Sequence, residues 1–180
     1  MAAERRVMFH SGTQTLIDHW TALPEARRIP ARSDFQPMAF GPLTPQLFMV
    51  EREGARLRLA GGWVERVHGR PLRGVDWLSV WREESRNMVL AAMVQAVREA
   101  RPVVLAADAE RMEGVLEIVV APLRNSAGEA DRLVGLYQPL NRLDREAEDV
   151  GALHARLSIG VGPIARAPLS LAAVDGRRIA

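Results

Sequence analysis

The first regular pattern of apolar residues along the chain has the spacing of a helix. Apolar side chains recur at intervals of three and four residues, which predicts an amphipathic helix over Ser11–Leu23 with the stripe Leu16, Ile17, Trp20 and Leu23. The next segment, Arg27–Pro45, contains four prolines and therefore cannot form one regular helix. We interpret it as a connector between this helix and the rest of the domain.

From Gln46 the apolar pattern changes to a period of two, which is typical of strands. The stretches Gln46–Glu51 and Arg56–Gly61 are separated by a short turn that contains Gly54, so they predict a β-hairpin. Strict alternation would place Leu57 and Leu59 on the buried face of the second strand.

Helical spacing returns after the hairpin. Trp63–His68 and Trp77–Trp81 are predicted as short helical pieces on either side of a turn, and Arg82–Ala100 is predicted as the longest helix because it carries one apolar stripe and precedes Pro102. These helical segments form one layer between two groups of strands.

Three further strands are predicted after the long helix. They cover Val103–Ala107, Gly114–Leu123 and Asp131–Leu140, and in the second of them Leu116, Ile118 and Val120 are expected to face the core, away from Glu117. The whole order predicts an α+β fold with a five-stranded antiparallel sheet and helices on one face.

The chain is expected to fold as one domain with extensions at both ends. With 180 residues and 48% apolar content it can bury one substantial core. We divide it into a helix and connector (1–45), a core (46–141) and a tail (142–180), in which a charged helix over Asp144–Arg156 leads into an extended arm, Leu157–Ala180. No run approaches the roughly 20 apolar residues of a membrane span, and no secretory signal is evident, so we expect a cytoplasmic protein.

The basic character of the chain comes entirely from arginine. All 24 basic residues are Arg, the net charge is only +2, and the high pI of about 10.2 follows from the high pKa of guanidinium groups. Arg alternates with Asp and Glu instead of forming one basic face, as in Glu51-Arg52-Glu53. We therefore expect no nucleic-acid partner.

Several sequence pieces in this order resemble the alphaproteobacterial single-domain PAS family. They are Asp18-His19-Trp20, Pro30-Ala31-Arg32-Ser33-Asp34-Phe35, Leu57-Arg58-Leu59-Ala60-Gly61, and Gly69-Arg70-Pro71-Leu72-Arg73-Gly74 leading into Trp81. The resemblance covers about Thr15 to Asn141. It implies a PAS fold and a sensor or adaptor without an active site, in a family some of whose members modulate motility and cell-cycle signalling.

The resemblance also implies a homodimer that signals to other proteins by contact. In PAS proteins the helix before the sheet is a common dimer element, and here its stripe Leu16, Ile17, Trp20 and Leu23 has no obvious place in the sheet core. The alternative is that this helix packs on its own domain.

The residues of the helical layer are the candidates for a ligand pocket. In a PAS domain this layer covers any internal cavity, and the candidate lining is Leu59, Trp63, Trp77, Trp81, Met93 and Ile118. Filling of the core by the indoles is the simpler interpretation, and any ligand is expected to be small and largely apolar. Arg70 either bonds neighbouring carbonyls or contacts an acidic ligand or partner.

Metal and cofactor chemistry finds little support in the sequence. The four histidines form no paired motif, and the chain has no cysteine for a metal centre or for the cysteinyl adduct of a blue-light flavin domain. Haem is disfavoured because haem-binding PAS domains generally carry their axial histidine on the long helix, which has none here. His68 alone is placed near the pocket region, where a lone histidine is more often a surface or capping residue than a ligand.

Catalysis is not predicted, although two alternatives to a sensor remain open. A small α+β barrel enzyme would place Asp, His or Tyr among the inward strand positions, whereas the positions that we assign inward are aliphatic: Leu57, Leu59, Leu116, Ile118 and Val120. A structural adaptor with a filled core would differ from a sensor only in lacking a cavity.

Overall fold

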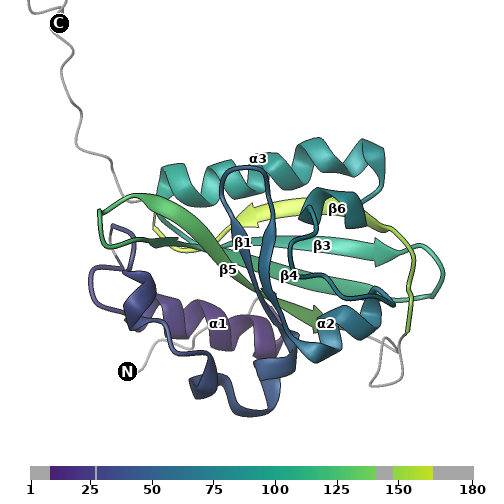
Figure 1. The fold of residues 1–180 in the computed structure, drawn as a ribbon, viewed down its shortest axis with the longest axis horizontal. Coiled ribbons are helices and arrows are strands. Elements are labelled where there is room, and N and C mark those ends of the chain that lie inside the picture. Colours follow the sequence, from purple (N-terminus) through teal and green to yellow (C-terminus); the bar gives the residue numbers. More distant parts are fainter. Residues whose placement is uncertain (1–8, 27, 141–147, 164–180) are drawn as a thin grey trace, which may run out of the picture.

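The computed structural model describes residues 9–26, 28–140 and 148–163. Its regular elements follow the predicted order closely up to the end of the fifth strand. They are α1 (Ser11–Ala22), the 3-10 helices η1 (Arg32–Asp34) and η2 (Pro37–Gln46), β1 (Leu47–Glu51), β2 (Leu57–Ala60), α2 (Gly62–Val67), the 3-10 helix η3 (Trp77–Val80), α3 (Glu83–Glu99), β3 (Val103–Ala109), β4 (Val115–Arg124), β5 (Ala130–Pro139) and β6 (Leu153–Gly160) (Figure 1).

The strands form one antiparallel sheet in the order β2-β1-β5-β4-β3-β6. The hairpin β1–β2 lies at one side of the sheet, because β1 pairs with β5 and not with β3, the next strand after the hairpin. The helical layer makes the crossover between the two halves, as the sequence order predicted. The α+β fold is confirmed.

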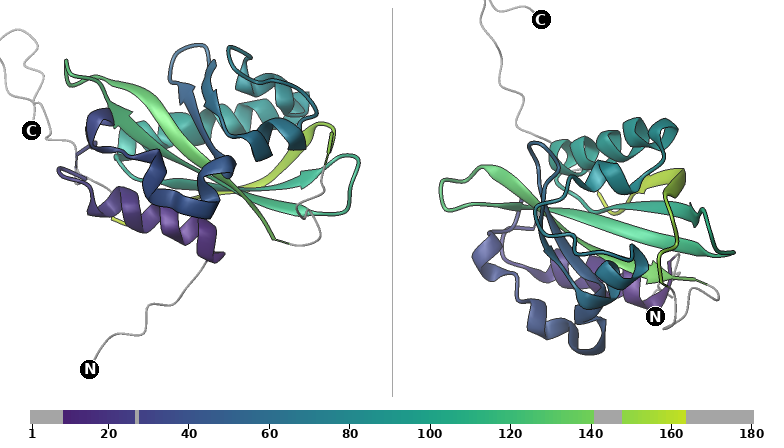
Figure 2. Two further views of the ribbon diagram at one scale, coloured as in Figure 1. Left: turned by 60° about the horizontal axis from the view of Figure 1, so that its bottom comes forward. Right: turned by 45° about the vertical axis from the view of Figure 1, so that its right-hand side comes forward.

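Both faces of the sheet are covered, which differs from the predicted single helical layer. α2, η3 and α3 cover one face and enclose the inner core, whereas α1 lies on the opposite face and encloses a second, outer core with Leu47, Val119, Val134 and Leu136 (Figures 1 and 2). Because β4 is buried on both sides, its sequence Val115–Arg124 is almost continuously apolar instead of alternating.

The tail contains a strand where we expected a helix and an arm. Leu153–Gly160 pairs with β3 as the sixth strand, so the predicted helix Asp144–Arg156 is wrong over its last residues, and the start of the predicted arm belongs to the same strand. The alternation Leu153, Ala155 and Leu157 is a strand pattern that the charged residues before it obscured. Residues 144–147 and 164–180 lie outside the described residues.

The second strand of the hairpin carries a bulge that reverses one side chain. Met49 pairs with Leu59 and Val50 pairs with Leu57, so Arg58 is an extra residue on β2. Leu57 is buried as predicted, but Leu59 shares the face of Met49 and is 41% exposed. The prediction that Leu59 lines the inner core is therefore wrong.

In the described part of the chain, the helices are all too short or too polar to cross a bilayer.

Candidate functional site

A buried hydrogen-bond network lies in the inner core, between the sheet and the layer formed by α2, η3 and α3. We call this layer the helical cover. The indole Nε1–H of Trp77 donates to the hydroxyl oxygen of Tyr137 at 2.9 Å, and Nε2 of His68 lies 3.2 Å from the same oxygen. Since Trp77 can only donate, the pattern that satisfies all three groups has the Tyr137 hydroxyl donating to an unprotonated Nε2 of His68. We call these three residues the buried triad.

Each member of the triad is held in place by a different element. Tyr137 lies on β5 with its side chain fully buried, Trp77 begins η3, which Asp76 caps through its side chain, and His68 ends α2 with its N–H donating to the Val64 carbonyl at 3.3 Å. The strand therefore supplies the central hydroxyl, and the helical cover supplies both of its partners.

Aromatic rings surround the triad and make its environment apolar. The ring of Phe48 lies 5.0 Å from that of Trp77 and 5.3 Å from that of Tyr137, and Trp81 stands edge-on to Trp77 at 5.6 Å between ring centroids. Phe48 fits against the sheet because residue 135 is glycine, where a Cβ would lie 2.3 Å from the Phe48 ring.

This environment changes the protonation of the triad. Burial, reinforced by the nearby charge of Arg70 and opposed by Asp149, lowers the pKa of His68 from 6.5 to about 4. Burial also raises the pKa of Tyr137 far above its usual value, against the effect of the Trp77 hydrogen bond. Both groups are neutral at pH 7, as their mutual hydrogen bond requires.

One donor beside the triad has no acceptor. The indole Nε1 atom of Trp81 is buried and makes no hydrogen bond among the described residues. A buried donor without a partner lowers the stability of the fold by about 1–3 kcal/mol. A hydrogen-bond acceptor at this position would therefore be favourable, and the inner core itself does not supply one.

The structure brings most of the predicted pocket residues together. Trp63, Trp77, Trp81, Met93 and Ile118 all belong to the inner core, and only Leu59 lies outside it. Tyr137, the single tyrosine of the chain, was not predicted as a site residue, although it is a polar residue at an inward strand position. Its alternation with Leu133 and Gly135 in the predicted strand was the available signal.

The other predicted site residues do not belong to the triad. Arg70 is exposed and donates to the Ser79 hydroxyl at 3.4 Å. The stripe of α1 is buried in the outer core at Leu16, Ile17 and Trp20, with Leu23 half-buried against it, so the helix packs on its own domain.

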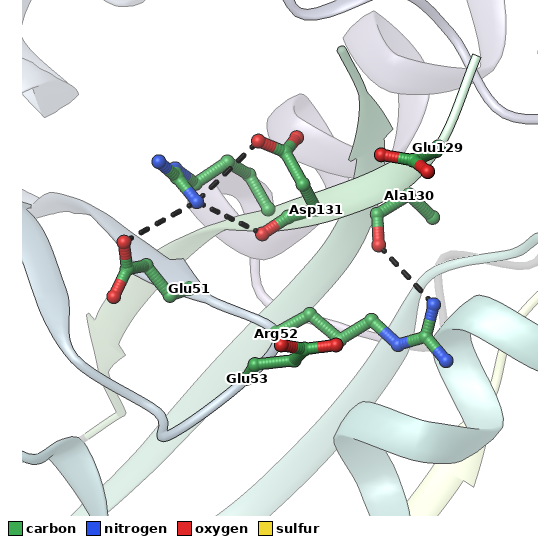
Figure 3. A pocket seen from close by; sticks show the side chains of 7 residues that line it. Glu51, Arg52, Glu53, Glu129, Ala130 and Asp131 are labelled. Atoms are coloured by element: carbon green, nitrogen blue, oxygen red, sulfur yellow. Dashed lines mark hydrogen bonds and ion pairs between the residues drawn. The ribbon is translucent and has the colours of Figure 1, made fainter. Parts of the chain in front are cut away.

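Two of the hollows on the surface of the described residues lie away from the inner core. The larger, of about 600 Å³, lies between the tips of the hairpins β1–β2 and β4–β5 (Figure 3). Arg132 pairs with Glu51 at 3.5 Å and with Asp131 at 3.4 Å, and Arg52 reaches the Ala130 carbonyl at 3.4 Å. The smaller follows the turn 108–115. Neither is lined by a predicted pocket residue, and acidic side chains outnumber the two arginines in the lining of the larger one.

No group of three or more His, Asp or Glu side chains in the described ranges is arranged to hold a metal ion.

Comparison with known families agrees with this architecture. The family model of the PAS domain matches residues 8–138, which is most of the chain and close to the range of the resemblance seen in the sequence. The chain belongs to the PAS domain family. PAS domains are generally sensory and signalling modules.

Comparison with individual proteins finds only distant structural matches. No curated protein matches the chain. A solved structure titled "Structure of RsLOV d2 variant" is 17% identical with a TM-score of 0.44, covering 55% of this chain and 61% of that one. A second RsLOV variant gives the same identity and TM-score, covering 56% of this chain and 63% of its own. The chain thus spans less than two thirds of the length of either structure.

Proposed function

We propose that this PAS domain is a non-catalytic regulatory module of the cytoplasm that acts in signal transduction through contacts with other proteins. Motility or cell-cycle control, the processes suggested by the family resemblance, are the first to examine. In this proposal Tyr137 has no catalytic role, because its hydroxyl is fully buried and is hydrogen-bonded to Trp77 and His68. The exposed Arg70 is a candidate partner contact on the helical cover.

We further propose that a small, largely apolar ligand with one hydrogen-bond acceptor modulates this activity. The observation that supports it is the unpaired Nε1–H of Trp81 beside the triad, within the described residues. An acceptor placed there would satisfy this donor, and the surrounding indoles would cover the apolar part of the molecule. Because Trp77 and Trp81 belong to the helical cover, binding would displace that cover and change the surface presented to a partner.

Native mass spectrometry of protein purified from its own host tests this proposal. A non-covalent adduct that is absent under denaturing conditions, and that is lost in Trp81→Phe but retained in Trp63→Phe, is the expected result. The control removes an indole from the same helical cover at a position that is not adjacent to the triad in the ring contacts. An adduct retained equally by both variants would contradict the assigned position.

A ligand-free adaptor is the second candidate, and one observation favours it. The aromatic side chains of the inner core are packed against one another, with Trp77, Trp81, Phe48 and Tyr137 all essentially inaccessible to solvent. Protein from the host that carries no adduct, and that still captures the same partner when Trp81 is replaced by Phe, would favour this adaptor over the sensor.

A further inference from the structure

The outward face of α3 carries apolar side chains that no other element of the described chain covers. Ser85, Val89, Ala92, Met93 and Ala96 are buried toward the sheet. At 100° per residue, Leu90, Ala91 and Val94 lie on the opposite side of the helix, together with the exposed polar residue Asn87. Leu90 is 44% and Val94 is 47% exposed, and α3 forms the outer boundary of the molecule on this side (Figure 1).

Charged residues of opposite sign lie at the two ends of this same face. Glu83 begins the helix and Arg98 lies in its last turn, and both are exposed without an ion pair among the described residues. Along the sequence, the midpoint between Glu83 and Arg98 falls between Leu90 and Ala91. The face therefore has an acidic end, then the polar Asn87, an apolar centre and a basic end, and its two charged ends are complementary when one copy is reversed.

We propose that this face of α3, comprising Glu83, Leu90, Ala91, Val94 and Arg98, is the docking site for a second copy of the chain. A two-fold axis near Leu90 and Ala91 places the two helices antiparallel, so that Glu83 lies beside the partner subunit's Arg98 and the same contact occurs twice. The small side chain of Ala91 at the centre allows the helix axes to approach closely. The antiparallel arrangement also opposes the two helix dipoles.

The proposed interface is small, which determines how it behaves. A 17-residue helix is about 25 Å long, and one helix-to-helix contact of that length belongs to the class of weak, transient interfaces. We therefore expect reversible, concentration-dependent dimerisation that weakens as salt screens the two ion pairs. The site is on the far side of α3 from the inner core, so it does not depend on the proposed ligand.

Charge reversal followed by sedimentation equilibrium tests the proposal. Glu83→Arg places like charges beside the partner's Arg98, and Arg98→Glu does the same beside the partner's Glu83, so each variant alone should dimerise at least tenfold more weakly than the wild type. One variant then carries arginine at both positions and the other carries glutamate at both. In an equimolar mixture the two variants can therefore form two attractive pairs, and the mixture should regain dimerisation that neither variant shows alone.

A matched pair of apolar replacements locates the contact. Val94→Glu should abolish dimerisation, whereas Leu157→Glu, at a residue of 44% exposure on the edge strand β6, should leave it unchanged. Circular dichroism confirms that each variant is folded. A wild type that stays monomeric at millimolar concentration, a mixture that does not associate, or dimerisation lost in Leu157→Glu and retained in Val94→Glu would each overturn the proposal.

Discussion

Nε2 of His68 and the hydroxyl oxygen of Tyr137 lie 3.2 Å apart in the inner core, although 69 positions separate the two residues in the chain. This contact joins the helical cover to the sheet through a polar group in an otherwise apolar interior. The same hydroxyl oxygen accepts a hydrogen bond from Trp77, so two residues of the helical cover, His68 and Trp77, are held by one oxygen atom. Changes at this oxygen should therefore affect both the stability of the domain and the position of the cover.

Replacing Tyr137 by Phe tests how strongly the hydroxyl holds the cover. The substitution leaves the Trp77 donor and the His68 nitrogen buried without partners, so the free energy of unfolding should fall by about 1–3 kcal/mol at pH 7. Urea denaturation measures this loss. In a double-mutant cycle with Trp77→Phe the two losses should be less than additive, because the first change already removes the shared hydrogen bond. Strict additivity would contradict the proposed coupling.

The protonation of His68 should give the domain a defined pH dependence. Its folded pKa of about 4 is below the 6.5 of an unfolded histidine, so between these values the unfolded state binds a proton that the folded state does not. Stability is therefore complete above about pH 6.5, falls as the pH decreases toward 4 and loses about 3 kcal/mol in total. Urea denaturation at pH 7, 6 and 5 follows this change.

A neutral replacement isolates the histidine from other titrating groups. In His68→Gln the decrease between pH 6.5 and 4.5 should be largely absent, whereas His154→Gln, on the edge strand β6, should keep the wild-type slope. The carboxylates Glu99 and Glu110, whose pKa values are lowered, also reduce stability toward the acid end of this window, and they do so equally in both variants. An unchanged slope in His68→Gln would mean that another group is responsible.

The close packing of β5 against Phe48 predicts opposite results for two glycines. A Cβ at Gly135 would lie 2.3 Å from the Phe48 ring and 2.5 Å from the Val119 carbonyl oxygen, so Gly135→Ala should lower the free energy of unfolding by about 3 kcal/mol. A Cβ at Gly62 meets no atom within 4 Å. Because Gly62 begins α2, Gly62→Ala should be neutral or stabilise by up to about 1 kcal/mol. Thermal unfolding of both variants compares them directly, and equal effects would contradict this packing.

The order of elements could be predicted because each one carries its own local signal. The stripe of α1, the apolar face of α3 and the turn residues between strands are readable without tertiary information, and they also carried the family resemblance. Local signals could not locate β6, since its pairing with β3 joins Leu153 to Ala109 across 44 positions and the preceding charges favoured a helix. For the same reason the bulge at Arg58, which turns Leu59 outward, is not visible in the alternating pattern.

The site was predictable in its apolar part and not in its polar part. Large indoles in the helical cover indicate an enclosed interior, and Trp77 and Trp81 do lie there. Which polar atoms meet depends on register: Tyr137 reaches His68 and Trp77 only because β5 pairs with both β1 and β4 in the observed alignment. Likewise, the sequence shows that α1 is amphipathic without showing that the sheet has a second apolar face to receive it.

The attachment of α1 to the sheet can be tested at Trp20. Its indole Nε1–H donates to the Pro122 carbonyl of β4 at 2.8 Å, within the outer core. Trp20→Phe leaves this buried carbonyl without the donor and removes apolar contacts, so the free energy of unfolding should fall by about 2–3 kcal/mol. Urea denaturation measures the loss, and Trp63→Phe, whose indole makes no hydrogen bond among the described residues, should cost less.

The same variant separates two roles for the N-terminal helix. If α1 serves only its own domain, as the burial of Trp20 indicates, folded Trp20→Phe protein should show the wild-type monomer–dimer equilibrium in sedimentation experiments. If the helix is the dimer element that the family resemblance implies, the dissociation constant should rise in this variant, because a loosened helix presents its partner with a disordered surface. A rise of tenfold or more, under conditions where circular dichroism shows the variant still folded, would shift the dimer contact from α3 to α1.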